Sequence, residues 1–204
     1  GQRDTMTDAV KQYFDLTGRS ALITGATRGI GFGLAAGLAQ AGAKIILNGR
    51  NLEKLAEATD RLRLQDVSAQ TLCFDVRDQP AVQKAINNYE SADGPIDILI
   101  NNAGIQHRQS LEDFASDKFQ DVMNTNATAL FYLGQAVTRH MKQRGQGKII
   151  NIASIMTKMA RHHVGAYVTA KAAVGGLTRA MTAEWAAYGI NCTASGHGYI
   201  STEL

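Results

Sequence analysis

Cysteine is scarce in this sequence of 204 residues, which contains only Cys73 and Cys192. Both lie in apolar, strand-like runs, so we expect buried, reduced thiols in a cytoplasmic protein. No group of cysteines and histidines has the spacing of a metal site. The sequence therefore predicts neither a disulfide framework nor a metal centre.

Long apolar runs and clusters of positive charge are also lacking. The longest apolar runs are too short to cross a bilayer, and the polar stretch 1–7 does not resemble a signal peptide. A net charge of +3 without a basic stripe gives little attraction for nucleic acid. We therefore expect a small-molecule partner, and neither nucleic acid nor a membrane.

Proline is rare too, with two residues against twenty glycines, while 45% of the residues are hydrophobic and 19% are charged. This composition is typical of a regular, soluble globular fold with tight turns rather than of a disordered or fibrous chain. A chain of this length has room for one domain with a substantial core. We interpret residues 1–15 as an N-terminal arm and residues 16–204 as a single domain.

Short β-like runs alternate with longer helical patterns from residue 20 onward. Such alternation predicts right-handed crossovers and a parallel sheet with helices on both faces. The expected fold class is therefore α/β, a single Rossmann-like, doubly wound parallel sheet. The expected strands are 21–23, 44–47, 70–74, 96–100, 148–152 and 190–194, and the expected helices are 30–41, 52–64, 81–89, two stretches within 111–144, and 167–187.

A glycine-rich segment, 24–31 (Thr-Gly-Ala-Thr-Arg-Gly-Ile-Gly), lies between the first expected strand and the first expected helix. The spacing of Gly25, Gly29 and Gly31 lets the backbone turn tightly and approach a pyrophosphate at the helix N-terminus. The alternative for such a segment is a plain tight turn between strand and helix. Its position after the first strand favours dinucleotide binding.

The end of the second strand indicates which dinucleotide is bound. An enzyme that uses NAD supplies an acidic side chain about 20 residues beyond the first glycine, but here the chain reads Asn48-Gly49-Arg50. Arg28 and Arg50 can clamp a ribose 2′-phosphate, because guanidinium groups suit phosphate oxygens. Each arginine alone is equally consistent with a solvated loop charge. Both together at the adenosine end favour NADP as the cofactor.

Polar residues also follow the later strands. Asp75, directly after the third strand, is a candidate partner for an adenine amino group, or else a cap of the next helix. The run 101–104 (Asn-Asn-Ala-Gly) follows the buried fourth strand, where small residues and amides can pack beside a cofactor; a plain loop is the alternative. Asn126 lies in an otherwise helical stretch, which indicates a specific hydrogen-bonding role or a kink.

The most distinctive pair is Tyr167 and Lys171, whose spacing places a phenol and an ammonium on one face of a helix. A free tyrosine has a pKa of about 10, and a cation within about 4–6 Å lowers that pKa toward the range useful for proton transfer. Ser154 ends the apolar run 148–153, so we expect its hydroxyl at the carboxyl end of the sheet, where open α/β sheets bind ligands. The alternative is a chance pair on a solvated helix.

In this order, the glycine-rich segment, the Asn-Asn-Ala-Gly run, Asn126, Ser154 and the Tyr167/Lys171 pair strongly resemble the motifs of the short-chain dehydrogenase/reductase family. The resemblance covers almost all of residues 16–204 and implies a single Rossmann domain with NAD(P)-dependent hydride transfer at a hydroxyl or carbonyl carbon. It implies that Tyr167 is the acid/base and that Lys171 lowers its pKa and holds the nicotinamide ribose. Ser154 would polarise the carbonyl, and Asn126 would support a proton-relay water. The cofactor-binding residues expected from the motifs and the resemblance are Gly25, Thr27, Arg28, Gly29, Ile30, Gly31, Arg50, Asp75, Val76, Asn102, Ala103, Gly104, Tyr167, Lys171, Gly198, Ile200 and Thr202.

Within the family, residues 101–108 and 135–141 resemble those of the gluconate 5-dehydrogenase group. Arg108 and Arg161 are accordingly candidates to receive a sugar-acid carboxylate, beside the substrate contacts expected of Ser154 and Tyr167. Surface solubility is the alternative for the two arginines.

The chain departs from the family pattern at three positions. His197, Thr193 and Lys158 stand where proline, asparagine and glutamate are usual. The chain also ends at Leu204, before the substrate lid, the following helix and the last strand that such enzymes carry. Two interpretations follow from this: an incomplete sequence, or a truncated and impaired member of the family.

The leading hypothesis is an NADP-dependent oxidoreductase of a sugar acid or polyol, interconverting gluconate and 5-ketogluconate. The alternatives are a 3-oxoacyl carrier-protein reductase and a catalytically impaired, NADP-binding protein with an assembly or regulatory role. Apolar, small-residue faces at 130–137 and 172–183, together with the resemblance, predict a homodimer or homotetramer.

Overall fold

The structure is a computed structural model that describes residues 13–198. The predicted N-terminal arm, 1–15, therefore lies almost entirely outside the described residues. The same holds for Ile200 and Thr202, the predicted contacts to the nicotinamide.

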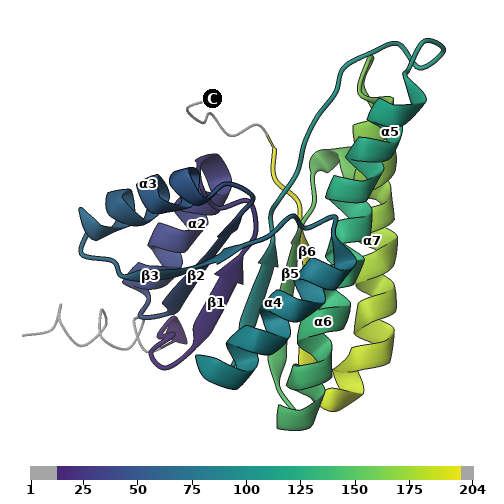
Figure 1. The fold of residues 1–204 in the computed structure, drawn as a ribbon. Helices are drawn as coiled ribbons and strands as arrows, with labels where there is room; N and C mark the ends of the chain where they lie inside the picture. The colour runs from purple at the N-terminus through teal and green to yellow at the C-terminus, as the bar shows by residue number, and fades with distance from the viewer. Residues whose placement is uncertain (1–12, 199–204) are drawn as a thin grey trace, which may run out of the picture.

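Six parallel strands form one sheet in the order β3-β2-β1-β4-β5-β6 (Figure 1). The strands are β1 (Ser20–Ile23), β2 (Lys44–Gly49), β3 (Ala69–Cys73), β4 (Ile98–Asn101), β5 (Gly147–Ile152) and β6 (Ile190–Ser195). The chain adds β2 and β3 on one side of β1 and then places β4, β5 and β6 on the other side. Ligands of open α/β sheets bind outside the carboxyl ends of the strands at such a reversal. The predicted fold class is confirmed.

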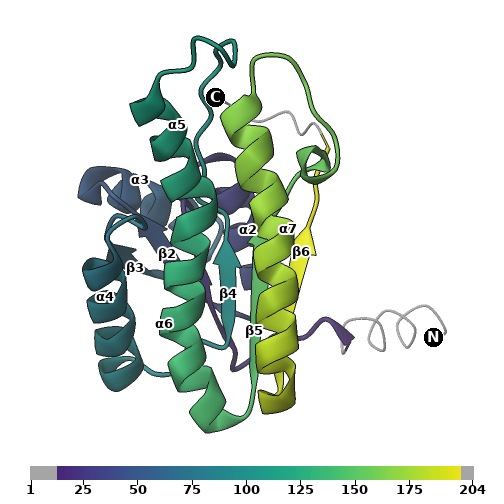
Figure 2. The same ribbon diagram turned by 90° about the vertical axis from the view of Figure 1, so that its right-hand side faces the viewer.

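Helices cover both faces of this sheet. They are α2 (Gly29–Gln40), α3 (Leu52–Arg63), α4 (Gln79–Ala92), α5 (Ser116–Met123), α6 (Ala129–Arg144) and α7 (Gly165–Trp185). A π-helical turn, η1 (Asn124–Thr128), joins α5 to α6, and short 3-10 turns lie at η2 (Ile155–Thr157) and η3 (Ala186–Tyr188). Figure 2 shows α4, α6 and α7 side by side on one face.

The core is divided by the alternation of side chains along the strands. Leu22, Leu99 and Ile149 pack with residues of α4, α6 and α7 on one face. Their neighbours Ile23 and Ile98 pack with residues of α2 and α3 on the other. Because both faces are covered, the central strands β1 and β4 are buried at every position, as expected of a parallel sheet.

Local signals fix several helix ends. Asn51 Oδ1 accepts a hydrogen bond from Lys54 N at 2.9 Å at the start of α3, and Asp78 Oδ1 accepts one from Ala81 N at 3.0 Å at the start of α4. Gly145, with φ of 68°, ends α6 in the left-handed conformation that suits glycine.

The prediction of two buried cysteines is half wrong. Cys192 is buried, and burial raises the pKa of its thiol to about 11. Cys73 is exposed because β3 is the edge strand of the sheet, where an apolar run is only partly covered. Within residues 13–198 no helix is long and apolar enough to cross a membrane, and no cluster of His, Cys, Asp and Glu side chains could hold a metal ion.

Candidate active site

The glycine-rich turn after β1 packs against the segment that follows β4. A Cβ atom on Gly31 would lie 2.5 Å from Asn102 Nδ2 and 2.7 Å from the carbonyl oxygen of Gly25. Gly25 itself has a φ of 60°, and a Cβ there would lie 2.8 Å from the Cα of Ala103. Only glycine therefore allows this close approach of two backbone segments.

Thr24 and Asn102 join the ends of β1 and β4 by hydrogen bonds. Thr24 Oγ1 accepts from the backbone N–H groups of Asn102 and Ala103, both at 3.0 Å. Asn102 Nδ2 donates to the carbonyl oxygens of Thr24 and Gly25 at 2.9 and 3.1 Å. These bonds hold the turn in place at the reversal of the strand order, so the Asn102 amide has a structural task beside its predicted cofactor contact.

Helix α2 begins inside this turn, with Arg28 at its N-cap and Gly29 (φ of 57°) as its first residue. Its first turn contains no acidic side chain, so nothing there opposes the partial positive charge of the helix N-terminus. A compact turn of glycines at a helix N-terminus has the shape and charge that a pyrophosphate requires. The residues present therefore fit a dinucleotide cofactor.

The predicted adenosine end brings Arg50, Asp75 and Arg77 together. Arg77 holds the Asp75 carboxylate through Nη2 at 2.7 Å and Nε at 3.1 and 3.2 Å, and Arg50 Nη1 lies 3.7 Å from Asp75 Oδ2. The hydrogen bond from Arg77 is the largest cause of a lowered Asp75 pKa. Asp75 does not cap α4, because Asp78 does. The helix-cap alternative for Asp75 is thus excluded.

Asn126 lies in the π-helical turn η1 and is fully buried. Its Oδ1 accepts a hydrogen bond from Ile105 N and its Nδ2 donates to Ile105 O, both at 2.8 Å. The side chain thereby fastens the loop that follows β4. The predicted kink and the predicted hydrogen-bonding role are both present.

Ser154 follows the last residue of β5 by two positions and stands at the carboxyl end of the sheet, as predicted. It is the N-cap of η2, where its Oγ accepts a hydrogen bond from Met156 N at 3.2 Å. Its own hydroxyl proton has no acceptor among residues 13–198. The Ser154 O–H therefore remains available to a ligand.

Tyr167 and Lys171 lie on one face of α7, with Lys171 Nζ 5.6 Å from the centre of the Tyr167 ring. Lys171 is only 5% exposed and donates a hydrogen bond to the carbonyl oxygen of Ile152 at 2.6 Å. Burial lowers the pKa of the Lys171 ammonium from 10.5 to about 8. Tyr167 packs partly buried against residues of α5, η1 and α7. The predicted juxtaposition of phenol and ammonium is confirmed.

The two arginines predicted to bind substrate lie on neighbouring loops. A backbone bridge pairs Gln109 with Val164, and Gln109 N donates to the carbonyl oxygen of His163 at 3.1 Å. The segment that carries Arg108 therefore runs beside the segment that carries Arg161. Both arginines are exposed.

The remaining predicted cofactor contacts differ in how exposed they are. Thr27 lies against the end of β2, where a Cβ on Gly49 would meet its Cγ2 at 2.9 Å. Val76 is 4% exposed and belongs to the core. Gly104 and Gly198 are exposed.

The departures from the family pattern are accommodated locally. The carbonyl oxygen of His197 accepts a hydrogen bond from Ile155 N at 3.3 Å, and its Nε2 lies 3.5 Å from Ser195 Oγ. The segment after β6 therefore lies beside η2 even without proline at 197. Thr193 and Lys158 are exposed.

Three residues that shape the site were not singled out by the sequence: Thr24, Ile105 and Arg77. Thr24 and Ile105 act through partners distant in the chain, and Arg77 acts through the side chain of Asp75, two residues away. Thr24 had a local signal, because it is the first residue of the glycine-rich segment.

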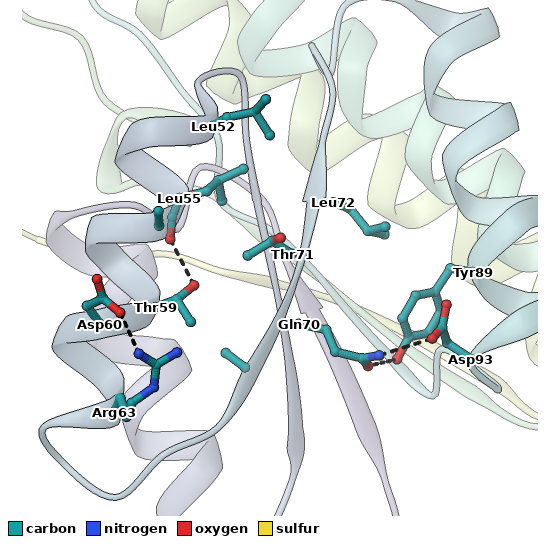
Figure 3. A pocket seen from close by; sticks show the side chains of 12 residues that line it. Leu52, Leu55, Thr59, Asp60, Arg63, Gln70, Thr71, Leu72, Tyr89 and Asp93 are labelled. Carbon is teal, nitrogen blue, oxygen red and sulfur yellow. Dashed lines mark hydrogen bonds and ion pairs between the residues drawn. The ribbon is translucent and has the colours of Figure 1, made fainter.

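A hollow of about 510 Å³ opens along β3, lined by residues of α3 and β3, by Tyr89 of α4 and by Asp93, the C-cap of α4 (Figure 3). Its polar groups are paired with one another: Tyr89 Oη donates to Gln70 Oε1 at 2.8 Å, and Gln70 Nε2 donates to Asp93 Oδ1 at 3.2 Å. None of the predicted catalytic residues lines it. The hollow is therefore separate from the candidate active site.

Comparisons with known proteins agree with this geometry. The family model described as short chain dehydrogenase matches residues 19–204. The chain is 47% identical over 191 residues to a gluconate 5-dehydrogenase of Gluconobacter oxydans (strain 621H), which covers 94% of this chain and 75% of that protein. It is 40% identical over 195 residues to a 5-keto-D-gluconate 5-reductase of Escherichia coli (strain K12), covering 96% of this chain and 77% of that protein.

A solved structure gives the same result in three dimensions. The crystal structure of a gluconate 5-dehydrogenase from Burkholderia cenocepacia J2315, in complex with NADP and tartrate, matches with a TM-score of 0.92 and 47% identity. The match covers 96% of this chain and 76% of that one. Together with the family match, this similarity shows that the chain belongs to the short-chain dehydrogenase family, whose members are NAD(P)-dependent oxidoreductases acting on CH–OH groups.

Proposed function

We propose that this protein uses NADP(H) to interconvert gluconate and 5-ketogluconate. The observation that carries the proposal is the placement of Ser154, Tyr167 and Lys171 at the carboxyl ends of the strands, where the glycine-rich turn also lies. The substrates in the names of the two relatives support the choice of sugar acid. Tartrate, found with NADP in the related crystal structure, is also a hydroxy acid.

Reduction of a ketone requires a proton at the carbonyl oxygen as hydride reaches the carbon. Bound NADPH supplies the hydride. In our proposal Tyr167 donates the proton, because its hydroxyl makes no hydrogen bond to another residue of the described range. The Lys171 ammonium, 5.6 Å from the ring centre, favours the negative charge left on the phenol oxygen. In the oxidation direction the same oxygen takes a proton from the alcohol.

Ser154 and Asn126 support this proton transfer in the proposal. The Ser154 hydroxyl, which already accepts from Met156 N, donates to the substrate oxygen, where a donor counts most as negative charge develops. Asn126 uses one donor and one acceptor on Ile105 and keeps further hydrogen-bonding capacity for a relay water.

Substrate choice is assigned to the neighbouring loops that carry Arg108 and Arg161, whose guanidinium groups suit a carboxylate. The test is NADPH oxidation with 5-ketogluconate, other keto sugars and an acetoacetyl thioester. Preference for 5-ketogluconate supports the proposal, whereas preference for the thioester favours the 3-oxoacyl carrier-protein reductase. NADPH binding without turnover of any substrate favours the impaired, assembly or regulatory alternative.

The preference for NADP over NAD is assigned to Arg28 and Arg50, with no carboxylate at the end of β2. Arg50→Asp should lower kcat/KM for NADPH about tenfold or more, because it removes a phosphate partner and adds a repulsive charge, while NADH is spared or improved. Arg63→Asp, at the far end of α3, is the matched control. A wild-type protein that already prefers NADH would contradict the assignment.

We also propose a homodimer or homotetramer. Much of the predicted α6 face is core, since Leu130, Leu133 and Val137 are buried, but Phe131 is 41% exposed. On α7 the small residues Ala172, Ala173, Ala180 and Ala183 are exposed. Light scattering should therefore show a dimer or larger species, and Ala173→Glu should shift it toward monomer. A monodisperse monomer at micromolar concentration would refute this assembly.

The proposal also covers the domain organisation of the chain and its location in the cell. We assign residues 16–204 to one NADP-binding catalytic domain, preceded by an arm. The scarcity of cysteine, two residues in 204, supports a cytoplasmic location.

A further inference from the structure

Four charged residues from three segments meet beside the predicted adenosine end. Asp75 follows β3, Arg50 follows β2, Arg77 lies two residues after Asp75, and Asp121 belongs to α5. Arg77 lies between the two carboxylates, with Nη2 2.7 Å from Asp75 Oδ2 and Nη1 3.4 Å from Asp121 Oδ1. Arg50 reaches the same Asp75 oxygen only to 3.7 Å.

The two arginines are therefore not equivalent partners of Asp75. Arg77 engages both carboxylate oxygens through its side chain, and its backbone N–H adds a bond to Oδ1 at 2.9 Å. Arg50 is beyond hydrogen-bond distance, and its side chain is 62% exposed. The lowered pKa of Asp75 has the Arg77 hydrogen bond as its largest cause and the Arg50 charge as its smallest. Asp75 is thus hydrogen-bonded by Arg77, while Arg50 makes only a longer ion pair with it at 3.7 Å and donates no hydrogen bond to it.

We propose that Arg77 is a positioning residue that sets the preference for NADPH over NADH by keeping Asp75 from forming a hydrogen bond with Arg50. The inference rests on the proposed function, in which Arg50 receives the 2′-phosphate. Without Arg77, the guanidinium of Arg50 would remain beside the Asp75 carboxylate. Asp75 would then compete with the phosphate for Arg50 and repel it. NADH lacks this phosphate, so its binding would change little.

The test is calorimetric binding of NADPH and NADH to the Arg77→Gln variant. We expect the Kd of NADPH to rise about tenfold and that of NADH to stay within about twofold. Arg77→Lys keeps the charge but not the bidentate hydrogen bonding, so its Kd for NADPH should lie between those of the wild type and Arg77→Gln. Arg63→Gln removes an equal charge at the far end of α3 and should leave both affinities unchanged.

A double variant separates positioning from a merely structural role. In an Asp75→Asn background the carboxylate that competes for Arg50 is gone and Arg77 keeps only its contact with Asp121, so adding Arg77→Gln should not weaken NADPH binding further. The inference is overturned if Arg77→Gln weakens the binding of NADPH and NADH equally, or if it weakens the binding of neither. It is also overturned if Arg77→Gln still lowers NADPH affinity in the Asp75→Asn background. These outcomes leave the NADP assignment intact. A wild type that prefers NADH, or an Arg50→Asp variant with normal NADPH affinity, would instead overturn the assignment and the inference together.

Discussion

Replacement of Tyr167 by phenylalanine should lower kcat by about 10²–10⁴-fold, which is about 3–5 kcal/mol of barrier. The ring and its packing against α5, η1 and α7 are kept, so only the proton-carrying oxygen is lost. NADPH affinity should remain close to that of the wild type. Steady-state kinetics with 5-ketogluconate and calorimetric binding of NADPH measure the two quantities separately.

The control for this variant is Tyr89→Phe, which removes the hydroxyl that donates to Gln70 beside the hollow along β3. Its kcat should be unchanged, because that hydroxyl is remote from Ser154 and Lys171 in the fold. If the Tyr167→Phe protein is folded and keeps more than about a tenth of the wild-type kcat, a loss below about 1.4 kcal/mol, Tyr167 is not the essential proton carrier.

Lys171→Met should lower kcat/KM by about 10²–10³-fold and also weaken NADPH binding. The variant keeps an unbranched apolar stem but loses the charge that faces Tyr167 and the hydrogen bond to Ile152 O. A loss in turnover without any loss in NADPH affinity would contradict the predicted contact of Lys171 with the nicotinamide ribose.

The same variant tests the burial of the ammonium through the pH dependence of stability. Because burial lowers the folded-state pKa of Lys171 from 10.5 to about 8, the unfolded chain holds more protons between these two pH values. Stability therefore rises with pH in that window. The penalty of the buried charge, about 3 kcal/mol, is fully present below pH 8 and absent above pH 10.5.

Urea unfolding is measured without NADP. As pH rises through this window, the free energy of unfolding of the wild type should increase relative to that of Lys171→Met by up to about 3 kcal/mol. Burial raises the pKa of Cys192, so its contribution to stability falls as pH rises. Cys192 is present in both proteins, and this contribution cancels in the difference. Parallel pH profiles of the two proteins would show that the Lys171 ammonium is not desolvated.

Local patterns were enough to predict the fold and part of the site. Strand and helix alternate in the sequence with distinct periods, so the order of elements and the parallel sheet could be derived directly. The juxtaposition of Tyr167 and Lys171 depends only on helix geometry, and the position of Ser154 depends only on the end of one strand. These are short-range relations, which a sequence displays.

Contacts between distant segments could not be predicted in the same way. Asn102 bonds to Thr24 across 78 positions, and that pairing exists only once β1 and β4 are neighbours. Cys73 lies in a run that looks buried, but its exposure depends on β3 being at the edge of the sheet. The role of Arg77 likewise depends on side-chain directions that the sequence does not encode locally.

The most direct test of the central claim is to trace deuterium from the nicotinamide C4 of the cofactor to C5 of the product. The protein is given 5-ketogluconate and NADPH deuterated at both positions of the nicotinamide C4, and the product is examined by NMR and mass spectrometry. We predict gluconate with one deuterium on C5, formed faster than with equally deuterated NADH. A product without deuterium at C5, or faster transfer from NADH, would contradict an NADP-dependent hydride transfer to the 5-keto group.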